Sequence, residues 1–481
     1  MTPERELVQA EVVVIGAGPA GLSAALAAAR AGARVTLIDN NHQPGGQYFR
    51  QPAVEFRVRK LAGHQRVGQA LTQRVTAAGV RLLTETTVWG AFEDKVLALY
   101  GPEAPEFIRA QAIVLARGAY ERPAAFPGWT LPGVMMSGAA QILLKSQRIL
   151  PGQRVVLAGT GPLQLVVAAG LVQAGAQVVA LLDGSPLLRI LFRPLHNGLA
   201  LWGQWSRLAE GLSSWWTLRR AGVPFRTGWG VLAAHGQDQL TGVTIAQLDD
   251  QWRPRPDTAT TLACDTLCCG YGFIPATHLS RLLGVRHEWQ PRRGGWVPLR
   301  DRHLQTNVPG VFAAGDCAGI GGAELAVIEG ELAGRAAAAQ VQGNGLNPSH
   351  EDAANGELER LRRAMRREQR FQQLYSELFT PGPGLDDLAR PETIVCRCEG
   401  VTRAQVSQAV QSGADTLAMV KGIARCGMGN CQGRICGPLV ATLVAQETGR
   451  DWAQVGQFSV RPPIFPIPVA ALAPRAEHPS N

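Results

Sequence analysis

The sequence predicts an α/β protein with two Rossmann-like units and a small helical domain near its C-terminal end. Three observations support this fold class. Residues 11–39 read as strand, glycine loop, helix and strand, and the same order returns in residues 154–183. Five of the nine cysteines then lie between Cys396 and Cys436. A chain of 481 residues is long enough for about three such domains.

The first glycine loop, Gly16-Ala-Gly18-Pro-Ala-Gly21, follows an apolar run that is typical of a buried parallel strand. In this G-x-G-x-x-G pattern the first glycine makes a tight turn, the second lets the backbone approach a pyrophosphate, and the third lets the helix pack on the strand. The helix that follows would direct free N–H groups and its positive dipole end at the phosphates. The loop therefore predicts a bound dinucleotide, with another parallel α/β fold as the alternative.

An acidic residue at the end of the next strand strengthens this prediction. Asp39 lies 23 residues after Gly16, close to the spacing of about 20 that places a carboxylate on ribose hydroxyls. The turn Pro44-Gly-Gly46-Gln47 comes next. It would bring backbone close to the cofactor, and an ordinary loop is the alternative.

A second contact with the same cofactor is expected at Gly315-Asp316, where a strand, a glycine and an acid precede a helix over residues 324–338. FAD needs such a contact because its ribityl chain and pyrophosphate extend beyond the first glycine loop. Asp316 would accept a hydrogen bond from a ribityl hydroxyl, and the helix N-terminus would face the flavin. The first unit is therefore expected to bind FAD rather than NAD.

The expected cofactor contacts come from these segments and from the turn after Arg117. They are Gly16, Gly18, Pro19, Ala20, Gly21, Asp39, Asn40, Gly46, Gln47, Gly118, Gly315 and Asp316. No histidine or carboxylate pair stands in a motif that would make a substrate base. The sequence therefore identifies no catalytic residue.

The second unit differs from the first at its loop, Gly159-Thr-Gly161-Pro-Leu-Gln164. Gln164 replaces the third glycine, so its side chain must fit where the helix should approach the strand closely. Asp183 ends the next strand and would disfavour a 2′-phosphate, which argues against NADP. Two interpretations stay open: a nicotinamide site, or a domain kept for its shape.

Five tryptophans stand between residues 202 and 229, in a stretch that reads as helical; they are Trp202, Trp205, Trp215, Trp216 and Trp229. Aromatic residues are enriched in interface cores, so a partner surface and ordinary core packing are both open. The remaining central cysteines flank a strand without a spaced partner and are read as small buried hydrophobes; they are Cys264, Cys268 and Cys269.

Composition and Pro/Gly-rich crossings suggest five segments. They are an FAD-binding domain (1–118 and 275–345), a second Rossmann-like domain (119–274), a basic helix with linker (346–391), a cysteine domain (392–460) and a Pro-rich tail (461–481). The arginines of the basic helix, residues 357–375, are read as a solvent-facing side. The tail is read as an extended, polyproline-like chain suited to lying over a neighbouring surface.

Charge and hydropathy exclude some functions. The formal net charge is +9, but the arginines are not interleaved with aromatic residues, so no nucleic-acid partner is expected. The first ten residues lack the pattern of a secretory signal, and no run of about eighteen residues is apolar enough to span a bilayer. A cytoplasmic chain is expected, in which the cysteines are thiols or metal ligands.

The C-terminal cysteines have the spacing of a ligand set. Cys396 and Cys398 form a C-x-C pair, and Cys431 and Cys436 form a second pair after 32 intervening residues. Four thiolates suit structural zinc, but zinc knuckles usually separate their cysteines by two to four residues. A [2Fe-2S] cluster beside a flavin would give an electron path, so the cluster is preferred. Cys426 stays open as a fifth candidate.

Together these motifs resemble the α (A-type) subunits of heteromeric bacterial amino-acid and imino-acid dehydrogenases. This group includes the A-type chains of opine oxidases, the α-subunits of hydroxyproline and proline dehydrogenases, and the B-type flavoprotein chain of hydrogen cyanide synthase. The motifs are GAGPAG, PGGQ, ARGAYERPAAFPGW, VFAAGDCAG, CRCEGVT and CGMGNCQGRICGP. The resemblance covers nearly the whole chain.

The resemblance implies a two-domain FAD fold of the thioredoxin-reductase (disulfide-reductase) type, followed by a domain like the bacterioferritin-associated ferredoxin (BFD). The ligands of its [2Fe-2S] cluster would be Cys396, Cys398, Cys431 and Cys436. Substrate would be oxidised by a D-amino-acid-oxidase-like flavoprotein, the separate β-subunit. Arg117 departs from the Ala-Thr-Gly usual in this fold, and the second domain lacks the Cys-x-x-Cys of thioredoxin reductases, which disfavours disulfide reduction.

The predicted function is that of an FAD- and [2Fe-2S]-containing electron-transfer subunit of a dehydrogenase that oxidises the C–N bond of an amino acid, imino acid or opine. Its electrons would pass to a quinone or another carrier, which allows a peripheral position at the inner membrane. A second flavin at a subunit interface and a small ferredoxin-like subunit stay open. The alternatives are a stand-alone NAD(P)H-dependent reductase and a zinc-stabilised redox sensor or scaffold.

Overall fold

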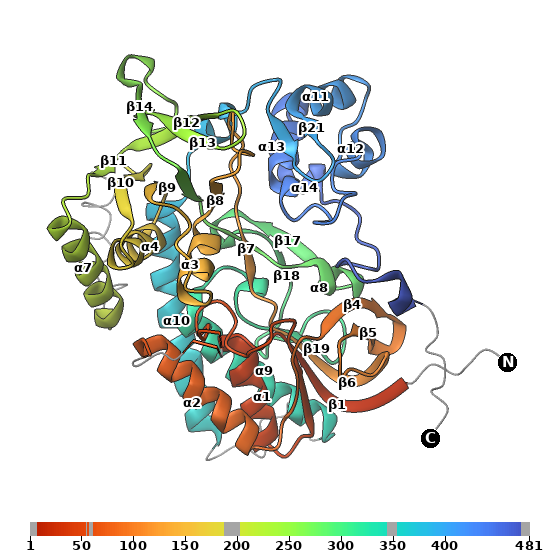
Figure 1. The fold of residues 1–481 in the computed structure, drawn as a ribbon. Coiled ribbons are helices and arrows are strands. Elements are labelled where there is room, and N and C mark those ends of the chain that lie inside the picture. The colour runs from red at the N-terminus through yellow and green to blue at the C-terminus, as the bar shows by residue number, and fades with distance from the viewer. Residues whose placement is uncertain (1–6, 54, 57–60, 187–202, 344–353, 473–481) are drawn as a thin grey trace, which may run out of the picture.

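The computed structural model describes residues 7–53, 55–56, 61–186, 203–343 and 354–472. Figure 1 shows one domain below, a second domain at the upper left and a helical domain at the upper right. The first and second domains each surround a sheet with parallel strands at its centre, so the predicted α/β class with two Rossmann-like units is confirmed.

The first sheet has the strand order β3-β2-β1-β6-β5-β4, and β19 pairs with β6. Its strands run parallel to their neighbours around β1, and the β4–β5–β6 meander is antiparallel. The strands are β1 (Leu7–Ile15), β2 (Val35–Ile38), β3 (Arg81–Leu83), β4 (Thr87–Phe92), β5 (Val96–Tyr100), β6 (Phe107–Leu115) and β19 (Val311–Ala313). Because β1 and β19 both pair with β6 in parallel, their C-terminal ends bring distant segments to one edge.

The helices of the first domain cover this sheet and come from both ends of its sequence. Helix α1 packs against α9 through small residues: a Cβ at Gly330 would lie 2.1 Å from the Ala20 carbonyl oxygen, and one at Gly334 would lie 2.2 Å from that of Ala24. The helical elements are α1 (Pro19–Arg30), α2 (Gly63–Ala77), α8 (His278–Leu282), α9 (Gly322–Val341), η1 (Glu93–Lys95), η3 (Pro291–Arg293) and η4 (Asp316–Ala318).

The second sheet has the order β11-β10-β9-β15-β8, all parallel, and a separate antiparallel sheet, β12-β13-β14, lies over it. The strands are β8 (Val134–Met136), β9 (Arg154–Gly159), β10 (Gln177–Asp183), β11 (Phe225–Thr227), β12 (Trp229–Gly236), β13 (Leu240–Gln247), β14 (Thr260–Ala263) and β15 (Thr266–Gly270). The helical elements are α3 (Ser137–Lys145), α4 (Pro162–Gln173), α7 (Trp205–Arg220) and η2 (Pro256–Thr258).

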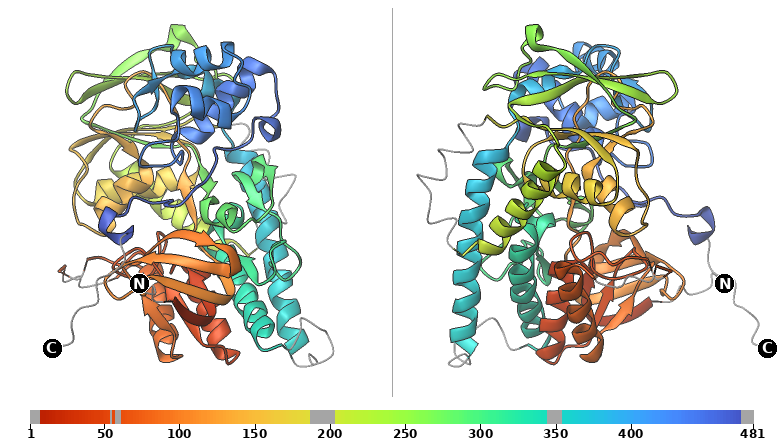
Figure 2. Two further views of the ribbon diagram at one scale, coloured as in Figure 1. Left: turned by 90° about the vertical axis from the view of Figure 1, so that its right-hand side faces the viewer. Right: turned by 60° about the vertical axis from the view of Figure 1, so that its left-hand side comes forward.

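One of two short ribbons joins these domains, and a long helix lies beside both domains. The chain crosses between the domains in this ribbon, which pairs β7 (Ala119–Glu121) with β16 (Phe273–Pro275). The second ribbon is a hairpin of β17 (His287–Gln290) and β18 (Gly295–Pro298). Helix α10 (Ala354–Phe379) runs upright from the first domain towards the second, beside α7 (Figure 2, right). Its exposed arginines confirm the predicted solvent-facing side; they are Arg363, Arg366, Arg367 and Arg370.

The C-terminal domain is a helical cluster with one small hairpin. Its elements are η6 (Pro383–Leu388), β20 (Ile394–Cys396), β21 (Val401–Thr402), α11 (Arg403–Gln411), α12 (Leu417–Ala424), α13 (Cys436–Thr448), α14 (Trp452–Val455) and η7 (Val469–Leu472). The Thr402 hydroxyl caps α11 by accepting a hydrogen bond from the Gln405 amide. The tail then crosses the first domain, where the Ile464 amide donates to the Trp89 carbonyl oxygen at 2.8 Å.

Two sequence interpretations are decided by burial. Trp205, Trp215 and Trp216 on α7 are 68, 39 and 51% exposed, so core packing is wrong for them; Trp202 lies outside the described residues. The central cysteines are buried, as predicted; they are Cys264, Cys268 and Cys269. Within the described ranges, none of the helices has both the length and the apolar composition needed to cross a bilayer.

Candidate cofactor sites

The first glycine loop has the geometry of a pyrophosphate cradle. Gly16 turns the chain at φ 104°, and a Cβ at Gly21 would lie 1.6 Å from the Gly16 carbonyl oxygen, so α1 meets β1 only because Gly21 has no side chain. Gly18 faces open space, and the nearest atom to its Cβ direction is the Gly46 Cα at 3.8 Å. The loop thus keeps room above its second glycine.

The start of α1 leaves backbone donors free. Helix α1 has no side-chain cap, and among the described residues the amides of Gly18, Ala20 and Gly21 have no hydrogen-bond acceptor. Unpaired N–H groups at a helix N-terminus are an anion site, because the helix dipole adds to them. The unpaired amides at the start of α1 therefore fit the pyrophosphate of FAD.

Asp39 lies beside this loop and is 6% exposed. Its carboxylate accepts hydrogen bonds from the Ala17 amide and, at 2.8 and 2.7 Å, from the amide and side chain of Asn41. Asn40, the residue expected here, is exposed, and its neighbour Asn41 makes the contact with Asp39. The carboxylate is therefore oriented at the position from which it would bind a ribose.

Arg50 is a site residue that the sequence did not indicate, since no motif includes it. Its Nη2 donates to the Asn41 Oδ1 at 3.2 Å, and its buried Nε has no partner in the described structure. Burial lowers the pKa of Arg50, while the nearby Asp39 raises it. An orphaned guanidinium N–H beside Asp39 fits an oxygen-rich ligand at this place.

The glycine turn and Gly118 lie around the same opening. Gly46, at φ 59°, approaches the first loop so closely that a Cβ there would lie 2.7 Å from the Gly18 Cα. Gly118, at φ 68°, has no atom within 4 Å of its Cβ direction, and Gln47 is exposed. The Arg117 guanidinium lies over the Phe465 ring at 4.7 Å, so its side chain points to the C-terminal tail.

The segment Gly315-Asp316 meets the first loop, as the fold class implies. A Cβ at Gly315 would lie 2.9 Å from the Ala20 Cβ. The Asp316 carboxylate accepts from the amides of Gly321 and Gly322 at 2.8 and 3.0 Å through one oxygen. Burial raises the pKa of Asp316, and the two amide hydrogen bonds oppose that shift. Its second oxygen remains for a ligand hydroxyl.

The second glycine loop has the same frame with different contacts. Its Thr160 amide donates to the Gly270 carbonyl oxygen at 2.9 Å, and its Gly161 amide donates to Asp183 at 3.3 Å. The Gln164 side chain accepts from the Ser137 hydroxyl at 2.9 Å and donates to the Gly270 carbonyl oxygen at 3.2 Å. Gln164 fits because Gly270 has no side chain: a Cβ there would lie 1.8 Å from the Gln164 amide nitrogen.

The five C-terminal thiols form one cluster. The Cys396 thiol lies beside those of Cys426 and Cys436, and the Cys431 thiol lies beside those of Cys436 and Cys398. These contacts lower the pKa of Cys396 and Cys431 and raise that of Cys436. The structure therefore brings the four predicted ligands together, with Cys426 beside them.

The five thiols have the donor atoms that a metal cluster needs, but their side chains are not arranged in a coordination geometry. Within the described ranges no three His, Cys, Asp or Glu side chains are arranged to hold a metal ion. The donors are nevertheless all sulfur, and four thiolates are what an iron–sulfur cluster or a structural zinc takes. A Cβ at Gly429 would lie 2.3 Å from the Cys398 Cβ, so the loop approaches closely only with glycine there.

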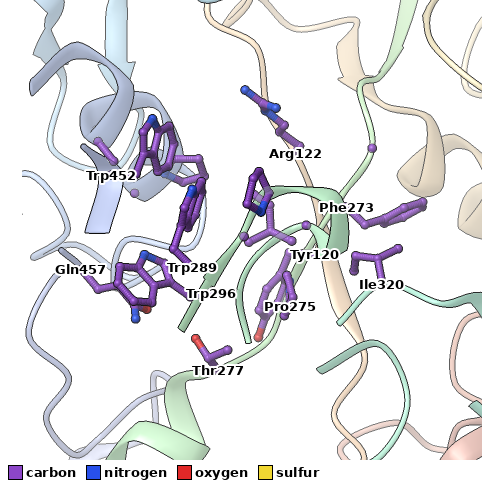
Figure 3. A pocket seen from close by; sticks show the side chains of 18 of the residues that line it. Tyr120, Arg122, Phe273, Pro275, Thr277, Trp289, Trp296, Ile320, Trp452 and Gln457 are labelled. Atoms are coloured by element: carbon purple, nitrogen blue, oxygen red, sulfur yellow. The ribbon is translucent and has the colours of Figure 1, made fainter. Parts of the chain in front are cut away.

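A cavity of about 430 Å³ lies between the two Rossmann-like domains and the cysteine domain. Figure 3 shows Trp289 and Trp452 on one wall, and their rings stack at 4.5 Å. The half-buried His278 also lines it: its buried Nδ1 has no partner in the described structure, and desolvation is the main cause that lowers its pKa to about 3. No sequence motif indicated this cavity, because its walls come from distant segments.

The cavity adjoins the cysteine loop. Arg434, three residues after Cys431, donates to the Tyr120 hydroxyl at 2.9 Å, and its guanidinium lies 4.0 Å from the Phe465 ring centroid. His278 Nε2 lies 3.3 Å from the Gln432 carbonyl oxygen. One wall of the cavity is thus the segment that carries the thiols.

Comparisons with known proteins agree with this architecture. Residues 10–343 match the family model of pyridine nucleotide-disulphide oxidoreductases, and residues 391–476 match the sarcosine oxidase A3 domain. The chain is 35% identical to the A-type chain of opine oxidase from Rhizobium meliloti, over 97% of this chain and 99% of that protein. It is 34% identical to the HcnB chain of hydrogen cyanide synthase from Pseudomonas aeruginosa, over 96% and 97%.

Solved structures share the fold. L-proline dehydrogenase from P. horikoshii superposes with a TM-score of 0.68 at 21% identity, covering 98% of this chain and 80% of that chain. Thioredoxin reductase from T. acidophilum reaches a TM-score of 0.50 at 19% identity, covering 70% of this chain and 99% of that chain. The predicted thioredoxin-reductase type of fold is therefore confirmed for the two Rossmann-like domains.

Proposed function

The chain belongs to the pyridine nucleotide-disulphide oxidoreductase family, and from that premise we propose that it is the electron-transfer subunit of a heteromeric dehydrogenase that oxidises a C–N bond. The substrate class is an amino acid, an imino acid such as proline, or an opine. FAD would bind in the first domain and a [2Fe-2S] cluster in the BFD-like C-terminal domain. Substrate oxidation would take place on a D-amino-acid-oxidase-like β-subunit.

The observation that carries this proposal is the pairing of an open glycine loop with a thiol cluster in one chain. FAD exchanges two electrons and an iron–sulfur cluster one, so the two groups together suit a relay between unlike carriers. The relatives named as subunits of opine oxidase and hydrogen cyanide synthase support an enzyme of several different chains. Three tryptophans exposed on α7 offer an aromatic surface for such a partner.

The chain's own residues would each do a defined task. The free amides of the first loop would bind the pyrophosphate, and Asp39 and Asp316 would accept hydrogen bonds from ribose and ribityl hydroxyls. The glycines at positions 46 and 118 would let the backbone approach the cofactor. None of these groups is a proton donor to substrate, which is consistent with catalysis on a partner chain.

The proposal keeps a second flavin, and the cavity beside the cysteine loop is a candidate place for it. Its stacked Trp289 and Trp452 suit a flat ring system, and Arg281 and Arg434 would favour a phosphate. A small ferredoxin-like chain remains part of the proposed complex as an electron carrier. No nucleic acid enters it.

Purified protein tests the proposal directly. It should show flavin absorbance and about two iron atoms per chain, with the optical and EPR spectra of a [2Fe-2S] cluster. Zinc in place of iron would favour the scaffold alternative, and a chain without flavin or iron would overturn the proposal.

Cysteine variants sharpen the test of the cluster. Cys431→Ser should lose most of the iron, because it removes a proposed ligand. Cys426→Ser is the matched control, since its thiol contacts Cys396 but is outside the proposed set, and it should keep the iron. Iron lost from Cys426→Ser and kept in Cys398→Ser would instead make Cys426 the fourth ligand.

A further inference from the structure

The C-terminal end of α10 lies directly on the second glycine loop. A Cβ at Gly161 would lie 2.7 Å from the Tyr375 hydroxyl oxygen and 3.6 Å from Cγ of Phe379. In a dinucleotide site the space above this second glycine admits the pyrophosphate. Two side chains of the same protein therefore stand where the phosphates would approach.

Two of the three donors that a pyrophosphate needs are also engaged. The Gly161 amide donates to Asp183, and the Gln164 amide lies 3.3 Å from the Gly161 carbonyl oxygen, whereas the Leu163 amide has no acceptor in the described structure. In the first loop the corresponding amides of Gly18, Ala20 and Gly21 have no acceptor in the described structure. The second loop keeps the shape of a phosphate cradle without most of its donors.

The Asp183 carboxylate also makes its hydrogen bonds with residues of the protein. It is 5% exposed and accepts from the Ser185 amide at 2.8 Å as well as from the Gly161 amide. The Thr160 and Ser185 hydroxyls bond to each other at 2.8 Å beside it. Asp39 beside the first loop is enclosed to a similar degree, at 6% exposed with hydrogen bonds from Ala17 and Asn41. The two loops therefore differ above the second glycine and not at the aspartate.

Helix α10 is held in this position along its length. Glu368 is 3% exposed, pairs with Arg207 of α7 at 2.9 Å, and accepts from Gln204 at 3.1 Å. Leu374 and Leu378, beside the two aromatic residues, are 2 and 8% exposed. The aromatic pair is therefore part of a packed layer between the two domains.

We propose that Tyr375 and Phe379 fill the second dinucleotide site, so that this chain excludes nicotinamide nucleotides and receives its electrons only from a protein or flavin donor. The two side chains determine specificity because they occupy the volume above Gly161 that a dinucleotide would otherwise take. The occupancy of the second loop does not rest on the cofactors assigned to the first domain or to the cysteines, whereas the statement about the electron donor rests on the proposed function.

The experiment measures nucleotide binding by the full chain and its Tyr375→Ala/Phe379→Ala variant. Calorimetric titration with NADH, NADPH and ADP should detect no binding to the wild-type chain at millimolar ligand. The variant should bind NADH or ADP at least tenfold more tightly than the wild type, because the space above Gly161 is open. Anaerobic NADH should leave the flavin absorbance of the wild type unchanged.

A matched control separates occupancy from a general loosening of α10. Phe371→Ala removes an aromatic ring on the same helix that lies over Arg207 and 6.5 Å from the Tyr375 ring, but is not among the nearest atoms to Gly161, so it should not gain nucleotide binding. Thermal unfolding and flavin content would show that each variant is folded. Micromolar binding of NADH by the wild type, equal binding by all three proteins, or a gain in Phe371→Ala would overturn the proposal.

Discussion

The two glycine loops of this chain share the same strand–loop–helix backbone, but the space above the second glycine is open in the first loop and filled in the second. Both join a parallel strand to a helix that begins with proline, and both are followed by a strand and an aspartate at its end. Above Gly18 the nearest atom to the Cβ direction is 3.8 Å away, whereas above Gly161 a tyrosine hydroxyl lies at 2.7 Å. Local sequence thus builds the frame, and contacts from distant segments decide whether a ligand can enter.

The third position of each loop makes the same point. Gly21 is required because the Gly16 carbonyl oxygen lies 1.6 Å from where a Cβ would be. Gln164 is tolerated at the equivalent place because Gly270, on another strand, leaves room for its carboxamide, and Ser137 satisfies it. The missing third glycine is thus compensated by Gly270, which leaves room for the Gln164 side chain, and by the Ser137 hydroxyl, which donates a hydrogen bond to it.

The largest expected effect is a difference in stability between variants at the third positions of the two loops. Gly21→Ala should destabilise the first domain by roughly 4 kcal/mol or more, because α1 must move away from β1 to relieve the overlap. Gln164→Ala should cost roughly 1–3 kcal/mol, since it leaves the Ser137 hydroxyl and the Gly270 carbonyl without the contacts that the carboxamide makes. Chemical unfolding and retained flavin would measure both. Equal losses in the two variants would contradict the comparison.

A smaller effect compares the two strand-end aspartates. Asp39→Asn should weaken FAD binding by about 1.5–3 kcal/mol, because a charge-assisted hydrogen bond to the ribose is replaced by a neutral one. Asp183→Asn is the matched control and should leave FAD affinity unchanged, since that carboxylate belongs to the second loop, where Tyr375 and Phe379 stand above Gly161. Fluorescence titration of the flavin-free proteins measures the difference. A weaker FAD complex in Asp183→Asn alone would reverse the assignment of the domains.

Much of the fold follows from local patterns. The strand, loop and helix order around Gly16 and Gly159 predicts β1, α1, β9 and α4, because apolar runs and glycine spacing act over a few residues. The helix at residues 357–375 is local in the same way. Gly315-Asp316 could also be placed, since parallel strands of one sheet end at a common edge.

The parts of the sites that escaped prediction depend on long-range contacts. The basic helix was expected to face solvent, and its arginines do, but periodicity does not reveal that Tyr375 reaches Gly161, more than 200 residues away. Arg50 belongs to no motif, and the cavity has walls from several segments. The choice between Asn40 and Asn41 beside Asp39 depends on one turn of backbone that spacing cannot resolve.

The smallest expected effect concerns two glutamates, the buried Glu329 and the half-buried Glu121, which the domains accommodate differently. In the first domain Glu329 pairs with the Arg300 guanidinium at 3.0 Å. Glu121, where the chain crosses to the second domain, accepts the Gly138 amide at 2.9 Å through both oxygens. Burial raises the pKa of Glu121 to about 7 from 4.5, although the amides of α3 oppose the shift.

A raised pKa makes the folded state bind the Glu121 proton more tightly than the unfolded state. The stabilisation is therefore complete below pH 4.5 and is lost as the pH rises through about 7. Glu121→Gln should remove this dependence and leave the free energy of unfolding flatter across that window by on the order of 1–2 kcal/mol. Urea unfolding at several pH values measures it, with Glu329→Gln as the comparison, since breaking that buried pair should destabilise the chain at every pH. A pH profile identical to that of the wild type would show that Glu121 titrates normally and that the crossing is better solvated than its packing indicates.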